Sequence, residues 1–257
     1  MNLLKSRLRE FKLSGIYNSI EERVSYAKTK NISYVELVEL LLEDEATNRR
    51  DNGYKKRYQK SKMPVYKTLE DFDYSFQPSI DRKLISDLAT CQFLSAKSNV
   101  VFIGNPGTGK THLSLGIGIK ALLKGHKVLF TSVGEMLQCL HISKADNSYY
   151  QKLRYYMDAD LLILDELGFK KLPNYSADDF FEVISRRYEK GSVIITTNKS
   201  LEQWGEIFSD SVLSSAIIDR VVHHGTVIKI NGPSYRRKDI KKKGGEDKSS
   251  QEALEGV

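Results

Sequence analysis

A glycine-rich octapeptide, GNPGTGKT, occupies residues 104–111 and follows the GxxxxGK[ST] pattern of a phosphate-binding loop. An apolar segment precedes it and an amphipathic segment follows it, which gives the strand–loop–helix context that the pattern requires. Its glycines let backbone N–H groups turn inward around phosphates, and the start of the following helix adds positive potential. We expect the Lys110 ammonium to reach the β- and γ-phosphates of a nucleotide. The expected nucleotide-binding residues are Gly104, Asn105, Pro106, Gly107, Thr108, Gly109, Lys110, Thr111 and His112.

Two adjacent carboxylates, Asp165 and Glu166, follow the apolar run LLIL at residues 161–164. Open α/β sheets bind ligands at the carboxyl ends of their strands, so these side chains are placed for chemistry on the phosphates. We expect Asp165 and the Thr111 hydroxyl to hold Mg²⁺, and Glu166 to orient and deprotonate the attacking water. A kinase would not need Glu166 there, so the pair favours ATP hydrolysis. Another apolar run ends in Asn198, which is a catalytic candidate for the γ-phosphate and lytic water, with a turn residue as the alternative.

The elements that must position these residues begin at about residue 81, where short apolar segments alternate with amphipathic ones. We expect helices at residues 110–123 and 176–189, among others. The expected strands are residues 100–103, 127–131, 161–164, 192–196 and 226–230. This alternation is typical of an α/β fold whose five-stranded, mostly parallel sheet is covered by helices on both faces.

The N-terminal segment, residues 1–63, is predicted to form a small all-helical domain. A capping box from Ser33 to Glu36 starts a helix whose phase continues to about Lys60. The basic residues along this helix are Arg49, Arg50, Lys55, Lys56, Arg57 and Lys60. We interpret them as candidate DNA contacts to phosphates, with a solvated helix face as the alternative. Residues 64–80 are then expected to be a linker, residues 81–240 the catalytic core, and residues 241–257 a disordered tail.

The composition of the 257-residue chain excludes several classes of protein. The net charge is +7, and the first 62 residues hold 14 Lys and Arg against 9 Asp and Glu, which indicates a polyanionic partner. No apolar run approaches the ~18 residues of a membrane span, and the N-terminus lacks a signal core. Cys91 and Cys139 have no metal-ligand or disulfide spacing. We therefore expect a cytoplasmic protein with no membrane partner.

Taken together, these motifs resemble an AAA+ ATPase, and they are most similar to the IstB-like ATPases, the transposition helpers of bacterial insertion sequences. The matching stretches are TLEDF (68–72), GNPGTGKTHL (104–113), LLILDELGF (161–169), SRRYEKGSVIITTN (185–198), WGEIF (204–208), AIIDRVVHH (216–224) and GPSYR (232–236). The helical N-terminus also fits, so the resemblance covers about residues 1–240. The DnaC-like helicase loaders share most of this core.

The resemblance implies roles for two arginines. Arg220 matches the arginine finger that reaches the nucleotide of a neighbouring subunit, and Arg236 matches the second sensor, which contacts the γ-phosphate in its own subunit. One departure is Pro233, where the family more often has Glu; proline removes a backbone donor and stiffens the turn before Arg236.

The resemblance also implies a function. The expected protein binds ATP and Mg²⁺ between subunits of a homo-oligomer, assembles on double-stranded DNA and assists the transposase of its insertion sequence. Two alternatives remain open at this point. One is a DnaC-like replicative helicase loader, which should prefer single-stranded DNA. The other is a DNA assembly factor that uses ATP as a latch and hydrolyses it little.

Overall fold

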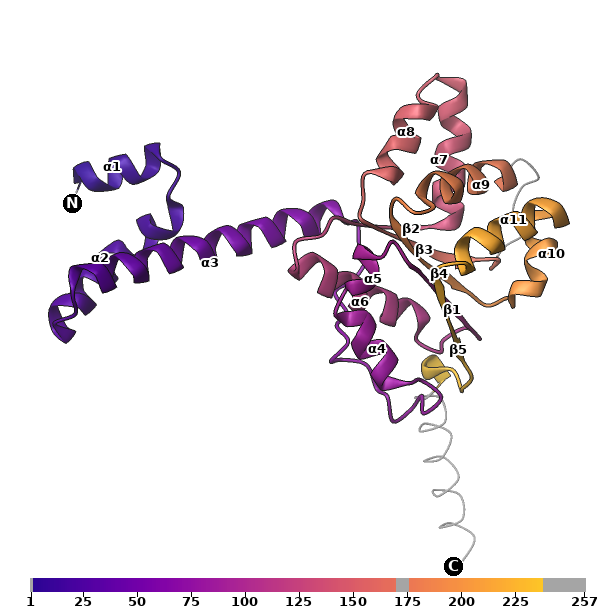
Figure 1. Ribbon diagram of the computed structural model, residues 1–257, viewed down its shortest axis with the longest axis horizontal. Helices are drawn as coiled ribbons and strands as arrows, with labels where there is room; N and C mark the ends of the chain where they lie inside the picture. The colour runs from indigo at the N-terminus through magenta and orange to yellow at the C-terminus, as the bar shows by residue number, and fades with distance from the viewer. Residues whose placement is uncertain (1, 170–175, 238–257) are drawn as a thin grey trace, which may run out of the picture. The chain divides into compact units, whose positions relative to one another are not determined.

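The computed structural model describes residues 2–169 and 176–237, and the expected tail at 241–257 lies outside them (Figure 1). The chain divides into two compact units, Met1–Arg57 and Tyr58–Val257. Within the described ranges, no helix combines the length and the apolar character needed to cross a lipid bilayer.

The N-terminal unit consists of α1 (Asn2–Glu10), α2 (Ser14–Lys30) and most of α3 (Tyr34–Lys60), so the helical prediction is confirmed. The Ser33 hydroxyl accepts the Glu36 N–H at 3.2 Å, as the predicted start of α3 requires. Four buried side chains from the three helices form the core of the unit: Leu8, Ile16, Ile20 and Leu41.

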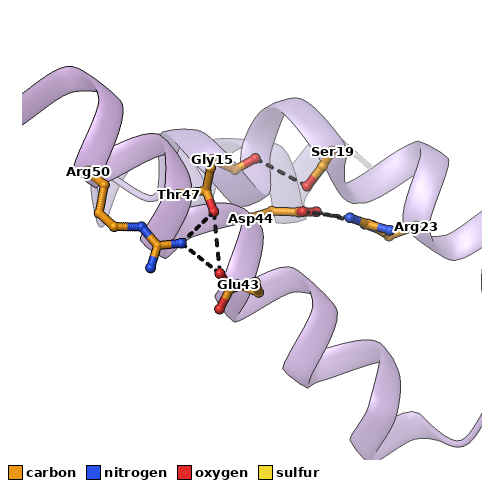
Figure 2. Close-up of polar contacts among 7 residues, drawn as sticks. All are labelled: Gly15, Ser19, Arg23, Glu43, Asp44, Thr47 and Arg50. Atoms are coloured by element: carbon orange, nitrogen blue, oxygen red, sulfur yellow. Dashed lines mark hydrogen bonds and ion pairs between the residues drawn. The ribbon is translucent and has the colours of Figure 1, made fainter. Parts of the chain in front are cut away.

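Polar contacts hold α2 against α3 at their crossing (Figure 2). The Arg23 guanidinium binds both carboxylate oxygens of Asp44, with Nε–Oδ2 at 2.8 Å and Nη2–Oδ1 at 2.7 Å. This pairing lowers the pKa of Asp44 to about 2. Nearby, the buried carboxylate of Glu45 accepts the N–H groups of Gly15 and Ile16 at 2.7 and 3.3 Å. Glu45 therefore caps the start of α2 from another helix. The N-cap residue itself, Leu13, has no side-chain acceptor for these N–H groups.

The second unit is built on a five-stranded parallel sheet with the order β2-β3-β4-β1-β5, and the predicted α/β class is confirmed. The strands are β1 (Asn99–Gly104), β2 (Val128–Ser132), β3 (Leu161–Leu167), β4 (Ser192–Thr197) and β5 (Gly225–Ile230). Each overlaps a predicted strand. The three central strands are apolar and buried on both faces, which is why continuous apolar runs marked them in the sequence.

Helices cover both faces of the sheet (Figure 1). The helices of this unit are α4 (Arg82–Ala89), α5 (Gln92–Ser95), α6 (Lys110–Leu123), α7 (Val133–Ala145), α8 (Tyr149–Met157), α9 (Ser176–Arg187), α10 (Trp204–Phe208) and α11 (Ser211–Val222). Helix α6 packs on β1 to β4 with α4 behind it, and α7, α9 and α11 share the core on the opposite face. Trp204 is fully buried in that second core, consistent with a packing role.

Residues 64–80, which we expected to be a linker, instead belong to the second unit. Leu69, Phe72 and Ile80 are buried there, and Glu70 forms an ion pair with Lys120 of α6 at 2.5 Å. The segment has no regular helix or strand, which is why the sequence indicated a linker. Its apolar side chains are nevertheless buried, and Leu69 packs against α6.

Candidate nucleotide-binding site

A cleft of about 450 Å³ opens at the carboxyl ends of β1, β3 and β4. The phosphate loop, the carboxylate strand and the strand that ends in Asn198 come together here, as predicted from parallel strands. The lining residues expected from the sequence are Pro106, Gly107, Thr108, Gly109, Lys110, Thr111, His112, Glu166, Asn198 and Arg236. Asp165 lies directly behind them, buried at 6% exposure.

The Lys110 ammonium is folded onto its own loop. Its Nζ donates to the carbonyl oxygens of Gly104 at 2.7 Å and Asn105 at 2.9 Å. Burial lowers the pKa of Lys110, and the nearby Arg236 charge adds to this effect, whereas the Asp165 carboxylate opposes it. A phosphate in the cleft would supply the negative charge that this half-buried ammonium lacks.

Asp165 receives two hydroxyl hydrogen bonds. Thr111 Oγ1, from the first turn of α6, donates to the carboxylate with distances of 2.9 and 3.1 Å to its two oxygens. Thr196 Oγ1, from β4, donates to Oδ1. Hydroxyl and carboxylate oxygens are ligands that Mg²⁺ prefers. The pair Thr111 and Asp165 therefore fits a Mg²⁺ ion that also binds nucleotide phosphates.

Glu166 reaches the cleft because the backbone of β3 is irregular beside it. The register between β3 and β4 shifts between Leu164 and Leu167, which is a β-bulge. Glu166 sits in the bulge with φ = +63°, an uncommon conformation for a residue with a Cβ atom. Its side chain is exposed and lines the cleft, while its N–H donates to Thr196 Oγ1 at 3.0 Å.

Asn198 follows β4 at the rim of the cleft. Its Oδ1 is buried and has no hydrogen-bond partner among the described residues. Buried acceptors in proteins are normally satisfied, so this amide is suited to receive a hydrogen bond from a water molecule in the cleft.

The segment 67–77 forms a wall of the cleft that the motifs did not assign. Its lining residues are Lys67, Asp71, Phe72, Asp73 and Gln77. The ring of His112 packs edge-on against Phe72 with centroids 5.2 Å apart, and its Nε2 hydrogen-bonds the Thr68 carbonyl at 2.7 Å. Burial lowers the pKa of His112, so the neutral ring serves to hold this wall in place. The apolar Leu69 and Phe72 within TLEDF were the available signal in the sequence.

Residues 231–236 follow β5, which pairs with β1, and they contact the phosphate loop. The Tyr235 N–H donates to the Gly107 carbonyl at 2.9 Å. Gly107 has φ = +82°, and a Cβ atom there would lie 2.1 Å from Ser234 Oγ. Gln77 Nε2 donates to the Pro233 carbonyl at 2.8 Å, which joins this turn to the wall formed by residues 67–77. This contact uses the Pro233 carbonyl as an acceptor, so it does not require the backbone N–H that proline lacks.

The two arginines lie in different places. Arg236 lines the cleft of its own chain. Arg220 does not: its Nη1 donates to the Ala216 carbonyl at 2.9 Å, and its guanidinium lies over the ring of Phe181, 4.9 Å from the centroid.

The basic residues of α3 differ in how far they are already paired. Arg49 binds Glu45 and Arg50 binds Glu43, each at 2.7 Å. The exposed lysines of the helix are Lys55, Lys56 and Lys60, and the described ion pairs include none of them. Arg57 is partly buried and makes contacts of its own.

The sequence pattern of one family matches residues 6–243, and this family is described as IstB-like ATP-binding protein. The chain belongs to this family. A relative from Pseudomonas aeruginosa, named as an ATP-binding protein of insertion sequence IS21, is 39% identical over 244 residues, 95% of this chain and 92% of the relative. A second, of insertion sequence IS5376 from Geobacillus stearothermophilus, is 40% identical over 214 residues, 83% and 85% of the two chains.

Solved structures agree on the fold of this IstB-like protein. The DnaC helicase loader superposes with a TM-score of 0.53 over 69% of this chain and 99% of that chain, at 18% sequence identity. The fold is thus that of an AAA+ P-loop protein. At this identity the likeness extends to the fold alone, so it does not decide between the functions of the two families.

Proposed function

We propose that this protein is a Mg²⁺-dependent ATPase that binds double-stranded DNA and assists a transposase. The observation that carries the proposal is the cleft where Lys110, Glu166 and Asn198 converge in front of Asp165. The names of the relatives, which refer to insertion sequences, support the role in transposition.

In this proposal the triphosphate enters the cleft and the Lys110 ammonium exchanges two backbone carbonyls for phosphate oxygens. Thr111 and Asp165 would hold Mg²⁺, which neutralises charge on the phosphates when it is bound. Glu166 takes a proton from water as the water oxygen attacks the γ-phosphorus, and the bond to the ADP oxygen breaks. Asn198 orients that water, and Arg236 stabilises the charge that develops on the γ-phosphate.

Arg220 would act across a subunit boundary. It is absent from the lining of the cleft in its own chain, and the contacts of its guanidinium with described residues are one carbonyl and an aromatic ring. A guanidinium held in this way can be moved to a phosphate of a neighbouring subunit at modest cost. ATP at such a boundary would couple nucleotide state to assembly of the homo-oligomer.

Contact with DNA would come from the basic residues of α3. Lys55, Lys56 and Lys60 are exposed and have their charge available, whereas Arg49 and Arg50 must first leave their carboxylates. Lysines neutralise phosphates without reading base edges, so binding should depend on salt and tolerate any sequence.

The first experiment is steady-state ATP turnover of the wild-type protein, Lys110→Ala and Glu166→Gln, with and without DNA. We expect Lys110→Ala to lose ATP binding, and Glu166→Gln to bind ATP normally and turn over at least 100-fold more slowly, on the order expected for a lost general base. Full activity of Lys110→Ala would refute the site. A wild-type protein that binds ATP without turnover would instead favour an ATP latch.

The second experiment tests the partner. Glu166→Gln is mixed with ATP and with matched double- or single-stranded DNA, and the size of the assembly is read by sedimentation. Large ATP-dependent assemblies on duplex DNA are expected. In Lys55→Ala/Lys56→Ala/Lys60→Ala the plot of log affinity against log salt concentration should become less steep, by about 3 in slope. A preference for single strands would point to a helicase loader instead.

A further inference from the structure

Thr196 occupies an unusual position between the two acidic residues of the cleft. It lies on β4, is 1% exposed, and stands two residues before Asn198. Its hydroxyl hydrogen donates to Asp165 Oδ1, and its hydroxyl oxygen accepts the Glu166 N–H at 3.0 Å. One side chain on the neighbouring strand thus touches the expected metal ligand and the backbone of the expected base.

The bulge in β3 explains why this contact is needed. The regular pairing of β3 with β4 is interrupted between Leu164 and Leu167, and Glu166 lies in this interruption. The Thr196 hydroxyl accepts the Glu166 N–H there. Glu166 is thereby fixed at φ = +63°, the backbone conformation from which its carboxylate lines the cleft.

The hydrogen-bond capacity of a hydroxyl suits this double contact. A hydroxyl has one donor and two acceptor lone pairs, and Thr196 directs the donor to Asp165 and one lone pair to Glu166. An N–H can only donate, so the hydroxyl oxygen accepts from Glu166 and its hydrogen is left for Asp165. Valine has the same shape as threonine but supplies neither contact.

We propose that Thr196 is a positioning residue for ATP hydrolysis, which sets the orientation of Asp165 and Glu166 together through one hydroxyl. This inference rests on the proposed ATPase function. A side chain of β4 would thus hold the expected metal ligand, Asp165, and the expected base, Glu166, in a fixed orientation relative to each other. The Thr111 hydroxyl also binds Asp165, but its one hydrogen is donated there and the Glu166 N–H is bound by Thr196, so Thr111 does not replace Thr196 in this respect.

The test is Thr196→Val, with Thr196→Ser and Ser192→Ala as comparisons. Ser192 is fully buried on the same strand, and its hydroxyl donates to the Phe93 carbonyl at 3.4 Å, so Ser192→Ala removes a hydroxyl of β4 away from the cleft. Each variant is assayed for ATP affinity, kcat, KM and the Mg²⁺ concentration that gives half-maximal turnover.

We expect the ATP affinity of Thr196→Val to stay within about 3-fold of wild type. Its kcat should fall on the order of 10- to 100-fold, and half-maximal turnover should require more Mg²⁺, as is typical when a partner of a metal ligand is removed. Thr196→Ser should restore kcat to within about 3-fold of wild type, because it keeps the hydroxyl. Ser192→Ala should retain wild-type kcat. A purely structural role would lower thermal stability in Thr196→Val without this split between kcat and ATP affinity.

Wild-type kcat and Mg²⁺ dependence in Thr196→Val, alongside an inactive Glu166→Gln, would overturn the inference and leave the proposed function intact. Wild-type turnover in Glu166→Gln would overturn the proposed function itself. If Thr196→Val does not fold, Thr196→Ala removes the same hydroxyl without placing a methyl group against Asp165, and its kcat is compared with that of Thr196→Ser in the same way.

Discussion

Gly107→Ala tests how the phosphate loop and the turn at residues 231–236 depend on each other. Gly107 has φ = +82°, where an alanine is disfavoured by about 1–2 kcal/mol. The added Cβ would also lie 2.1 Å from Ser234 Oγ and 3.0 Å from Ser234 Cβ, so the turn must move. Overpacking of this kind costs at least about 1 kcal/mol. The two effects together amount to about 2.5 kcal/mol, or close to 70-fold in affinity.

This cost should appear in ATP affinity because the alanine loop can relax in the free protein and must return to the strained conformation to bind phosphate. The assay is equilibrium titration with a fluorescent ATP analogue, with circular dichroism to verify folding. Ser234→Ala is the control, and the double variant Gly107→Ala/Ser234→Ala keeps the strain at φ but relieves the contact. We expect the double variant to recover to between about 5- and 30-fold weaker than wild type. Wild-type affinity in Gly107→Ala would refute the reasoning, and a double variant no better than the single would refute its steric half.

Three further predictions concern stability. Glu45→Ala should speed hydrogen exchange in α2 and lower the free energy of unfolding of the N-terminal unit by about 1–3 kcal/mol, because two N–H groups lose their acceptor. Unchanged exchange would show that water replaces the cap. The Arg23 guanidinium holds the pKa of Asp44 near 2, below the ordinary 3.8. The pair therefore stabilises the N-terminal unit fully above about pH 4, and this contribution is lost as the pH falls through 2. The free energy of opening of α2, measured by hydrogen exchange as a function of pH, should show this loss in wild type and not in Asp44→Asn. Arg187→Met should lower the free energy of unfolding by at least about 3 kcal/mol, because the buried Arg187 donates to three carbonyls; exposed Arg186→Met is the control for urea unfolding.

Much of the fold could be predicted because its signals are local. The phosphate loop lies between a strand and a helix that periodicity alone identifies, and α6 begins and ends at the predicted residues, Lys110 and Leu123. Parallel strands present their carboxyl ends at one edge, so the presence of Glu166 and Asn198 in the same cleft followed from the fold class.

The features that could not be predicted depend on partners distant in the sequence. Glu45 caps a helix that begins about 30 residues earlier, and no pattern within α2 indicates it. The wall at residues 67–77 has no regular secondary structure, so its burial becomes apparent only when α6 lies beneath it. The bulge at Glu166 arises from a mismatch with β4, and neither strand shows this by itself.

The order of strands in the sheet determines when the nucleotide-binding site can be completed during synthesis of the chain. During synthesis the phosphate loop leaves the ribosome long before β5, yet β5 is the strand that pairs with the open edge of β1. The Gly107 carbonyl gains the Tyr235 N–H later still. A nascent chain that lacks β5 therefore carries its phosphate loop at the end of a strand with an unpaired edge. We expect such a chain to bind ATP only after residue 236 has emerged. Nucleotide binding would then indicate that the second unit is complete, and chains that end before residue 231 should fail to bind ATP.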